Sequence, residues 1–186
     1  MVTLGMLWLP IVVSAVAVFL ASFVVWMVLP YHKTDYRKLP DEDSVRAAMN
    51  KQKLSPGQYM IPYCANPKQM QEPLFVKKME EGPVGTITLR PAGPYNMGMR
   101  LALSVVYNLG VAVFVAYLAG RTVAPGAEYL QVFRVAGTAT LLAYGGALFY
   151  PAIWMGRPWS TAVKDIFDAL VYTALTAGIF GWLWPR

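Results

Sequence analysis

Four long apolar runs limit what this chain can fold into more than any other feature of its sequence. They cover residues 8–29, 99–119, 132–154 and 161–184, and the middle third of each contains no Asp, Glu, Lys, Arg or His. Each run is close to the ~20 residues that a helix needs to cross the hydrocarbon core of a bilayer. Only a helix satisfies all the backbone polar groups of such a segment internally. We therefore expect an all-α integral membrane protein with four transmembrane helices.

The composition excludes several classes of function. Only 14% of the 186 residues are charged, whereas a soluble domain has about 25%. Cys64 is the only cysteine and His32 the only histidine, so an intrachain disulfide, a multi-Cys zinc site and a bis-histidine haem are excluded. Phosphate loops, dinucleotide-binding glycine patterns and hydrolase motifs are also absent from the sequence. We expect no catalytic residue, no cofactor and no metal site.

The apolar runs divide the chain into three parts. We expect a first transmembrane helix in residues 1–30, an insert in residues 31–98, and transmembrane helices two to four in residues 99–186. The insert has too many aromatic residues for a disordered linker. Its pattern predicts a small α+β structure, with helices over residues 41–51 and 67–81 and strands over residues 58–63 and 86–90.

The basic residues predict the orientation in the membrane. Eleven of the 16 Lys and Arg residues lie between the first two runs or at the start of the second, and two more lie near the link between runs three and four. The opposite side has three. Cytoplasmic loops carry the excess of Lys and Arg, so we expect a cytoplasmic insert and periplasmic termini. The net charge of +6 is then explained by contact with anionic lipids, and we expect no nucleic-acid partner.

Small residues recur every four positions in the fourth run, at Ala169, Thr173, Ala177 and Gly181. Such spacing forms a flat face on which a second helix can approach closely. The partner of this face is either another helix of the same chain or a helix of another subunit. A homo-oligomer or a complex with other membrane proteins follows from the second alternative.

Asp165 and Asp168 are the candidate functional residues at the cytoplasmic start of the fourth run. Their spacing of three places them on one face of a helix, where paired carboxylates could bind a cation or relay a proton. The alternative is that they are acids near a helix N-terminus, favoured by the helix dipole and paired with Lys164 or Arg157. Asp168 lies about two turns into the run, where a charge becomes costly.

Two further residues are candidates. Arg134 lies near the start of the third run, where it either holds a lipid phosphate or a quinone-like headgroup or extends to the interface as a structural arginine. Asn108 is the only amide within a run, and an interhelical hydrogen bond is its expected role. His32, with Tyr31 and Asp35, and Cys64 are possible metal ligands, but each alone is a weak signal.

Several stretches resemble an uncharacterised family of small bacterial inner-membrane proteins. They are FRVAGTATLLAYG, TAGIFGWLWPR, and the insert pattern PYHKTDYRKLPDED followed by PGQYMIP. The resemblance covers most of the chain and implies a bacterial inner-membrane location. Because no activity is assigned to that family, the resemblance implies no functional residue.

Together these features favour a non-enzymatic accessory or scaffold subunit of an inner-membrane complex, acting through helix packing and its basic insert. One alternative is a transporter or channel for a small or lipophilic solute, with a path lined by Asn108, Thr173 and Thr176. The other is a membrane-embedded enzyme acting on a lipid or quinone, which requires Asp168 to lie close to Arg157 or Lys164.

Overall fold

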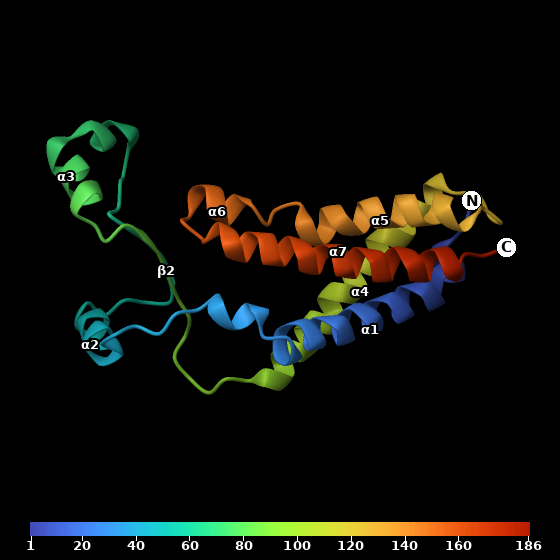
Figure 1. The fold of residues 1–186 in the computed structure, drawn as a ribbon, viewed down its shortest axis with the longest axis horizontal. Coiled ribbons are helices and arrows are strands. Elements are labelled where there is room, and N and C mark those ends of the chain that lie inside the picture. Colours follow the sequence, from blue (N-terminus) through green and yellow to red (C-terminus); the bar gives the residue numbers. More distant parts are fainter. The chain divides into compact units, whose positions relative to one another are not determined.

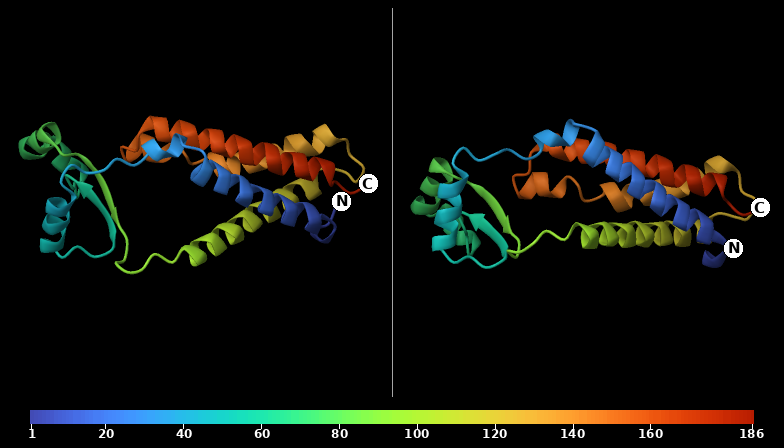
Figure 2. Two further views of the ribbon diagram at one scale, coloured as in Figure 1. Left: turned by 60° about the horizontal axis from the view of Figure 1, so that its bottom comes forward. Right: turned by 90° about the horizontal axis from the view of Figure 1, so that it is seen from below.

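The computed structural model describes residues 1–186, and most of them are helical (Figures 1 and 2). The chain forms two compact units. We call the first the helical unit; it contains Met1–Asp35, Asn96–Ala152 and Arg157–Arg186. We call the second the insert unit; it contains Tyr36–Tyr95 and Ile153–Gly156.

Three helical stretches of the chain are long and apolar enough to cross a membrane. They are Leu4–Val28, Met97–Thr122 and Tyr129–Trp154. The first joins η1 (Leu4–Leu7), α1 (Trp8–Phe23) and the π-helical turn η2 (Val24–Val28), the second is α4 (Met97–Thr122), and the third contains α5 (Tyr129–Gly145) and α6 (Tyr150–Trp154). This confirms three of the four predicted runs as candidate spans and is compatible with a multi-pass membrane protein.

The fourth run is also helical, but it is not one of these three stretches. It forms α7 (Trp159–Trp182), a helix of 24 residues. Its first turns carry Lys164, Asp165 and Asp168, and these charges lower its hydropathy. The remainder of α7, beyond Asp168, is uncharged.

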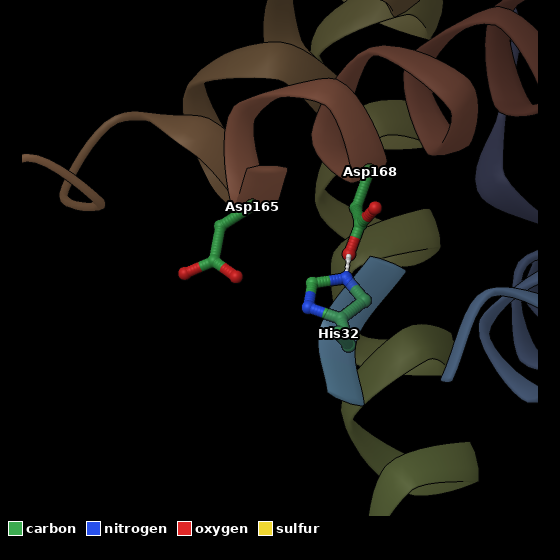
Figure 3. A group of neighbouring side chains, drawn as sticks. All are labelled: His32, Asp165 and Asp168. Atoms are coloured by element: carbon green, nitrogen blue, oxygen red, sulfur yellow. Dashed lines mark hydrogen bonds and ion pairs between the residues drawn. The ribbon is translucent and has the colours of Figure 1, made fainter. Parts of the chain in front are cut away.

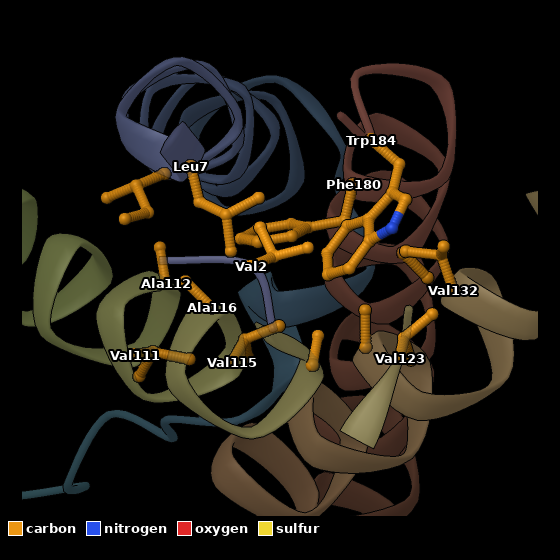
Figure 4. Packing of buried hydrophobic residues seen from close by; sticks show 14 of the residues in the cluster. Val2, Leu7, Val111, Ala112, Val115, Ala116, Val123, Val132, Phe180 and Trp184 are labelled. Carbon is orange, nitrogen blue, oxygen red and sulfur yellow. The ribbon is translucent and has the colours of Figure 1, made fainter. Parts of the chain in front are cut away.

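The helical unit is held together by α7 lying along α5, by α1 packing on α4 and α7, and by α4 packing on α5. Small and β-branched residues fill the core between them, as Figure 4 shows for Ala112, Ala116 and Val132 around Phe180. Such residues allow helices to approach closely, and in lipid this contact replaces the hydrophobic gain that packing brings in water.

Both chain ends lie at the same end of the helical unit (Figure 1). The Val2 amide donates to the Gly120 carbonyl at 3.2 Å, and the Gly126 amide donates to the Pro185 carbonyl at 2.9 Å. The Trp184 indole N–H donates to the Ala124 carbonyl at 2.9 Å. The two termini therefore meet at the link between α4 and α5.

The third run is interrupted earlier than its proline predicts. The sequence suggests that Pro151 bends or ends this helix, but α5 already ends at Gly145, and Pro151 lies in the first turn of α6. A β-carbon at Gly146 would lie 2.6 Å from the Leu142 carbonyl oxygen. The glycine at position 146 therefore permits the break, and the proline occupies a helix start, where its missing N–H costs nothing.

The insert unit contains one antiparallel pair of strands, β1 (Gly57–Ile61) and β2 (Gly85–Leu89), in which Tyr59 pairs with Ile87. The predicted helix over 41–51 is confirmed as α2 (Glu42–Lys51), capped by the Asp41 carboxylate. The single helix predicted over 67–81 is wrong. It is divided into η4 (Pro67–Gln71) and α3 (Pro73–Glu81), because Pro73 keeps Glu72 out of the helical region.

Candidate functional site

A cluster of charged and hydrogen-bonding side chains forms where the segment after α1 meets the first turns of α7. Pro30 follows the π-helical turn, and a single 3-10 turn, η3 (Tyr31–Thr34), comes next. This turn packs against α7. We call the group of Tyr31, His32, Asp35, Arg157, Lys164, Asp165 and Asp168 the polar cluster; all seven belong to the helical unit.

His32 lies at the centre of the polar cluster. Its side chain is buried, and its ring lies parallel to the Trp26 indole, with 3.9 Å between the ring centres. The Nδ1 atom is 2.5 Å from an Asp35 carboxylate oxygen, and the Nε2 atom is 2.9 Å from Asp168 Oδ2. The imidazole is thus fixed between the carboxylates of Asp35 and Asp168 and one aromatic face; Figure 3 shows its contact with Asp168.

Asp35 connects the turn to α7. The Lys164 ammonium donates to Asp35 Oδ1 at 2.6 Å and to the Tyr31 carbonyl at 2.7 Å. Burial of the Asp35 carboxyl acts to raise its pKa, but the hydrogen bonds from Lys164 and His32 outweigh this effect and hold the pKa below its ordinary value. Asp35 is therefore a carboxylate at neutral pH, and it attracts the Lys164 ammonium and the His32 ring beside it.

The two acids of α7 have different partners. Asp165 forms an ion pair with Arg157, with 2.6 Å between Oδ2 and the guanidinium nitrogen. Asp168 accepts from the Tyr31 hydroxyl and contacts His32. Burial, and then the hydrogen bond to Asp168, raises the pKa of the Tyr31 hydroxyl above its ordinary value, so Tyr31 stays protonated as a donor. Asp168 is thus the buried carboxylate of the cluster whose contacts are with a tyrosine and a histidine.

Asp165 and Asp168 are predicted by the sequence pattern, but the contacts that His32 and Asp35 make with α7 are not. The ring and the carboxylates are separated by more than 130 positions along the chain. One local signal was available: His32 and Asp35 have the same spacing of three as Asp165 and Asp168, and both pairs lie at the ends of apolar runs that face the same predicted side.

The other two sequence candidates, Asn108 and Arg134, contact residues outside the polar cluster. Asn108 is buried and accepts a hydrogen bond from the Tyr144 hydroxyl at 3.0 Å, which joins α4 to α5. Arg134 is exposed and borders a shallow apolar hollow of about 400 Å³ together with Leu118, Thr138 and Leu142. Asn108 thus makes the expected kind of bond, and Arg134 lies on the outer surface of the unit.

The small-residue face of α7 lies against α5. A β-carbon placed on Gly137 would be 3.4 Å from Ala177 and 3.7 Å from Thr173. On either side, Gly145 lies next to Ala169 in the same way, and Gly181 lies next to the Tyr129 ring. The small residues of the two helices therefore face each other within this chain.

A second feature is an apolar hollow of about 550 Å³ in the insert unit. Four methionines line it, together with Phe75, Trp154 and residues of β1 and β2; the methionines are Met60, Met70, Met79 and Met155. Side chains at its rim are exposed, among them Met60 and Met70. The Thr86 hydroxyl donates to the Met155 carbonyl at 3.2 Å, so the segment Ile153–Gly156 is fixed to the edge of the sheet.

No family model, curated protein or solved structure matches this chain. Its function therefore has to be inferred from the polar cluster, the apolar hollow and the helix packing.

Proposed function

We propose that this chain is a four-span protein of the bacterial inner membrane with periplasmic termini and a cytoplasmic insert. Three stretches have the length and hydropathy of spans, and α7 lies along one of them. The charges near the start of α7 are paired within the polar cluster, which lowers the cost of placing them near the interface. Four spans agree with both termini at one end and with the thirteen-to-three division of basic residues.

The single cysteine tests this topology. Cys64 is a free thiol in the insert unit, partly accessible to solvent. In intact cells, a membrane-impermeant maleimide should leave Cys64 unlabelled, and labelling should appear after the inner membrane is permeabilised. A variant with a cysteine placed after Arg186, combined with Cys64→Ala, should show the opposite pattern. Labelling of Cys64 in intact cells would contradict the proposed orientation.

Within this topology we assign the chain a non-enzymatic role, as an accessory or scaffold subunit that binds another membrane protein through its insert. The apolar hollow carries this proposal. Large exposed apolar patches mark interaction sites, and methionine side chains adapt to varied apolar partners. The small-residue faces of α5 and α7 are not evidence for binding to another subunit, because they face each other within this chain.

The expected occupant is an apolar segment of a partner protein that also carries acidic residues. The hollow offers space for several apolar side chains. Residues 36–95 contain nine Lys or Arg and six Asp or Glu residues, so this segment carries a net positive charge. Complementary charge on a partner guides its approach and fixes its register.

Site-specific photo-crosslinking in cells tests the hollow. A photoreactive side chain at Met79 should give one protein adduct of defined mass, and a second substitution, Met60→Lys, should abolish it by placing a charge in the hollow. A photoreactive side chain at Lys51, which is exposed on α2, is the matched control and should give no such adduct. The same adduct from both positions, or lipid adducts alone from Met79, would refute the proposal.

A second candidate function is a membrane-embedded enzyme acting on a lipid or quinone. It is favoured by one observation, that the polar cluster gathers buried acids and fixed cations: Arg157 pairs with Asp165 and Lys164 with Asp35, while Asp168 contacts His32. Buried acids beside fixed cations are typical of active sites as well as of structural ion networks. Co-purification of a stoichiometric lipid or quinone with the native chain, and its loss in Asp165→Asn, would favour this candidate over the scaffold.

A further inference from the structure

The strongest unassigned feature of the molecule is a set of three potential metal ligands inside the polar cluster. His32, Asp165 and Asp168 are all buried, and each offers one ligand atom such that all three atoms lie within 4.8 Å of one another. Figure 3 shows both carboxylates extending from the same side of α7 towards the imidazole. The three donors come from two segments, η3 and α7, which other contacts hold together.

The contacts of His32 require a positive species beside its Nε2 atom. Asp35 lies 2.5 Å from Nδ1, and a carboxylate there accepts the Nδ1 proton. In the neutral ring, Nε2 then carries a lone pair. That lone pair faces Asp168 Oδ2 at 2.9 Å, and two acceptors at this distance repel each other unless a cation lies between or beside them.

The charges around Asp168 lead to the same requirement. Lys164 contacts Asp35, and Arg157 contacts Asp165. Asp168, at 4% exposure, contacts Tyr31 and His32 instead. A buried carboxylate is stabilised by a fixed cation or a metal ion. Either a proton on His32 or a metal ion supplies that charge.

The arrangement around His32 favours the metal ion. A metal-ligating histidine nearly always donates its other ring N–H to a carboxylate or carbonyl, which fixes the tautomer and raises the basicity of the ligating nitrogen. Asp35 occupies that position on His32. Ligands held about 2.1 Å from one metal ion lie about 3 Å apart at right angles and about 3.4 Å apart at the tetrahedral angle; the 2.9 Å between Nε2 and Asp168 Oδ2 is close to the first of these spacings.

We propose that His32 Nε2, Asp165 and Asp168 bind one divalent transition-metal ion, with Asp35 orienting the imidazole. One imidazole and two carboxylates suit Zn²⁺ and Mn²⁺ better than Mg²⁺ or Ca²⁺, which take oxygen ligands alone. Three protein ligands leave a coordination position open for water or a small ligand. Arg157, whose side chain is 33% exposed, pairs with Asp165 on the side of the site that is nearest to solvent. This inference is independent of the role assigned to the insert.

Metal analysis of the full-length chain tests the proposal. The chain is purified in mild detergent without a histidine tag, so that His32 is the only imidazole present. It is then loaded with Zn²⁺ or with Co²⁺, which reports nitrogen and oxygen ligands by its visible spectrum, and freed of excess metal. We expect one ion per chain, lost with a weakening of about 100-fold or more in His32→Gln and Asp165→Asn. Asp35→Asn should weaken binding about 10- to 100-fold, the range for outer-shell carboxylates.

Two controls separate this site from adventitious binding. Cys64→Ala removes the only thiol, and Asp43→Asn removes an exposed acid on α2; both should bind the ion as the native chain does. Asp165→Asn is the main variant, because asparagine has nearly the same size and its amide oxygen still accepts a hydrogen bond from Arg157, so the fold is expected to survive. A folded native chain that retains no stoichiometric Zn²⁺ or Co²⁺, or that binds it equally well as Asp165→Asn or His32→Gln, overturns the proposal in favour of a proton on His32.

Discussion

Replacing Asp168 with alanine should lower the free energy of unfolding of the helical unit by about 3–5 kcal/mol, the cost of removing one partner from a buried charged pair. Asp168 is only 4% exposed. It accepts a hydrogen bond from the Tyr31 hydroxyl and contacts the His32 ring. Without Asp168, the Tyr31 hydroxyl and the His32 ring remain buried and lose their partner on α7. Thermal unfolding in detergent, followed by tryptophan fluorescence, measures the change.

The matched control for this variant is Asp43→Ala. Asp43 lies on α2, its side chain is 95% exposed, and its contact with Arg46 is long, at 3.7 Å. Exposed ion pairs contribute between 0 and about 1 kcal/mol, so this variant should be nearly as stable as the native chain. Equal stability of Asp168→Ala and Asp43→Ala would show that the polar cluster does not hold η3 to α7.

The second large effect is expected at the contact between α5 and α7. Ala177 is fully buried, and a β-carbon on Gly137 would lie only 3.4 Å from it. Ala177→Leu introduces three carbon atoms where the two helices already touch, and it should cost about 1–3 kcal/mol, as overpacking does in general. Gly181→Leu should act in the same way, because a β-carbon at position 181 would lie 2.7 Å from the Tyr129 ring.

Ala174→Leu provides the control on the same helix. It is the same substitution, three positions before Ala177, on an exposed face of α7. In a bilayer or micelle, this face contacts lipid or detergent, so the larger side chain should change the melting temperature little. Similar melting temperatures for Ala174→Leu and Ala177→Leu would mean that close packing of α7 on α5 does not limit stability.

The sequence predicted those parts of the fold that depend on local chemistry. Apolar runs of sufficient length predicted the long helices, and Asp41, followed by two acids, predicted the start of α2. The strands that became β1 and β2 were predicted by short runs between turn residues. The sequence suggested a break in the third run at Pro151, whereas the helix ends after Gly145. The close contact that a side chain at position 146 would make with the backbone is not visible in a sequence.

The polar cluster was predicted only in part, for a physical reason. Asp165 and Asp168 share a face because helical periodicity requires it. The contacts of Asp168 with His32 and Tyr31 depend on how α1 and α7 pack, and no periodicity of either segment determines that packing. The direction of η3 after Pro30 decides which side chains reach α7, and a single sequence does not specify that direction.

The position of the cluster along the chain has a consequence for the order of synthesis. His32 and Asp35 are translated early, and their partners Asp168 and Lys164 follow 136 and 129 positions later. Domains assemble as the ribosome releases them, N-terminal part first. Until α7 emerges, the imidazole and the carboxylate have no partners from the last helix and keep their hydration. The bundle therefore closes at this end only when its last helix is in place, and a nascent chain cut short before α7 would expose the His32–Asp35 pair without the carboxylate and the ammonium that contact it in the finished protein.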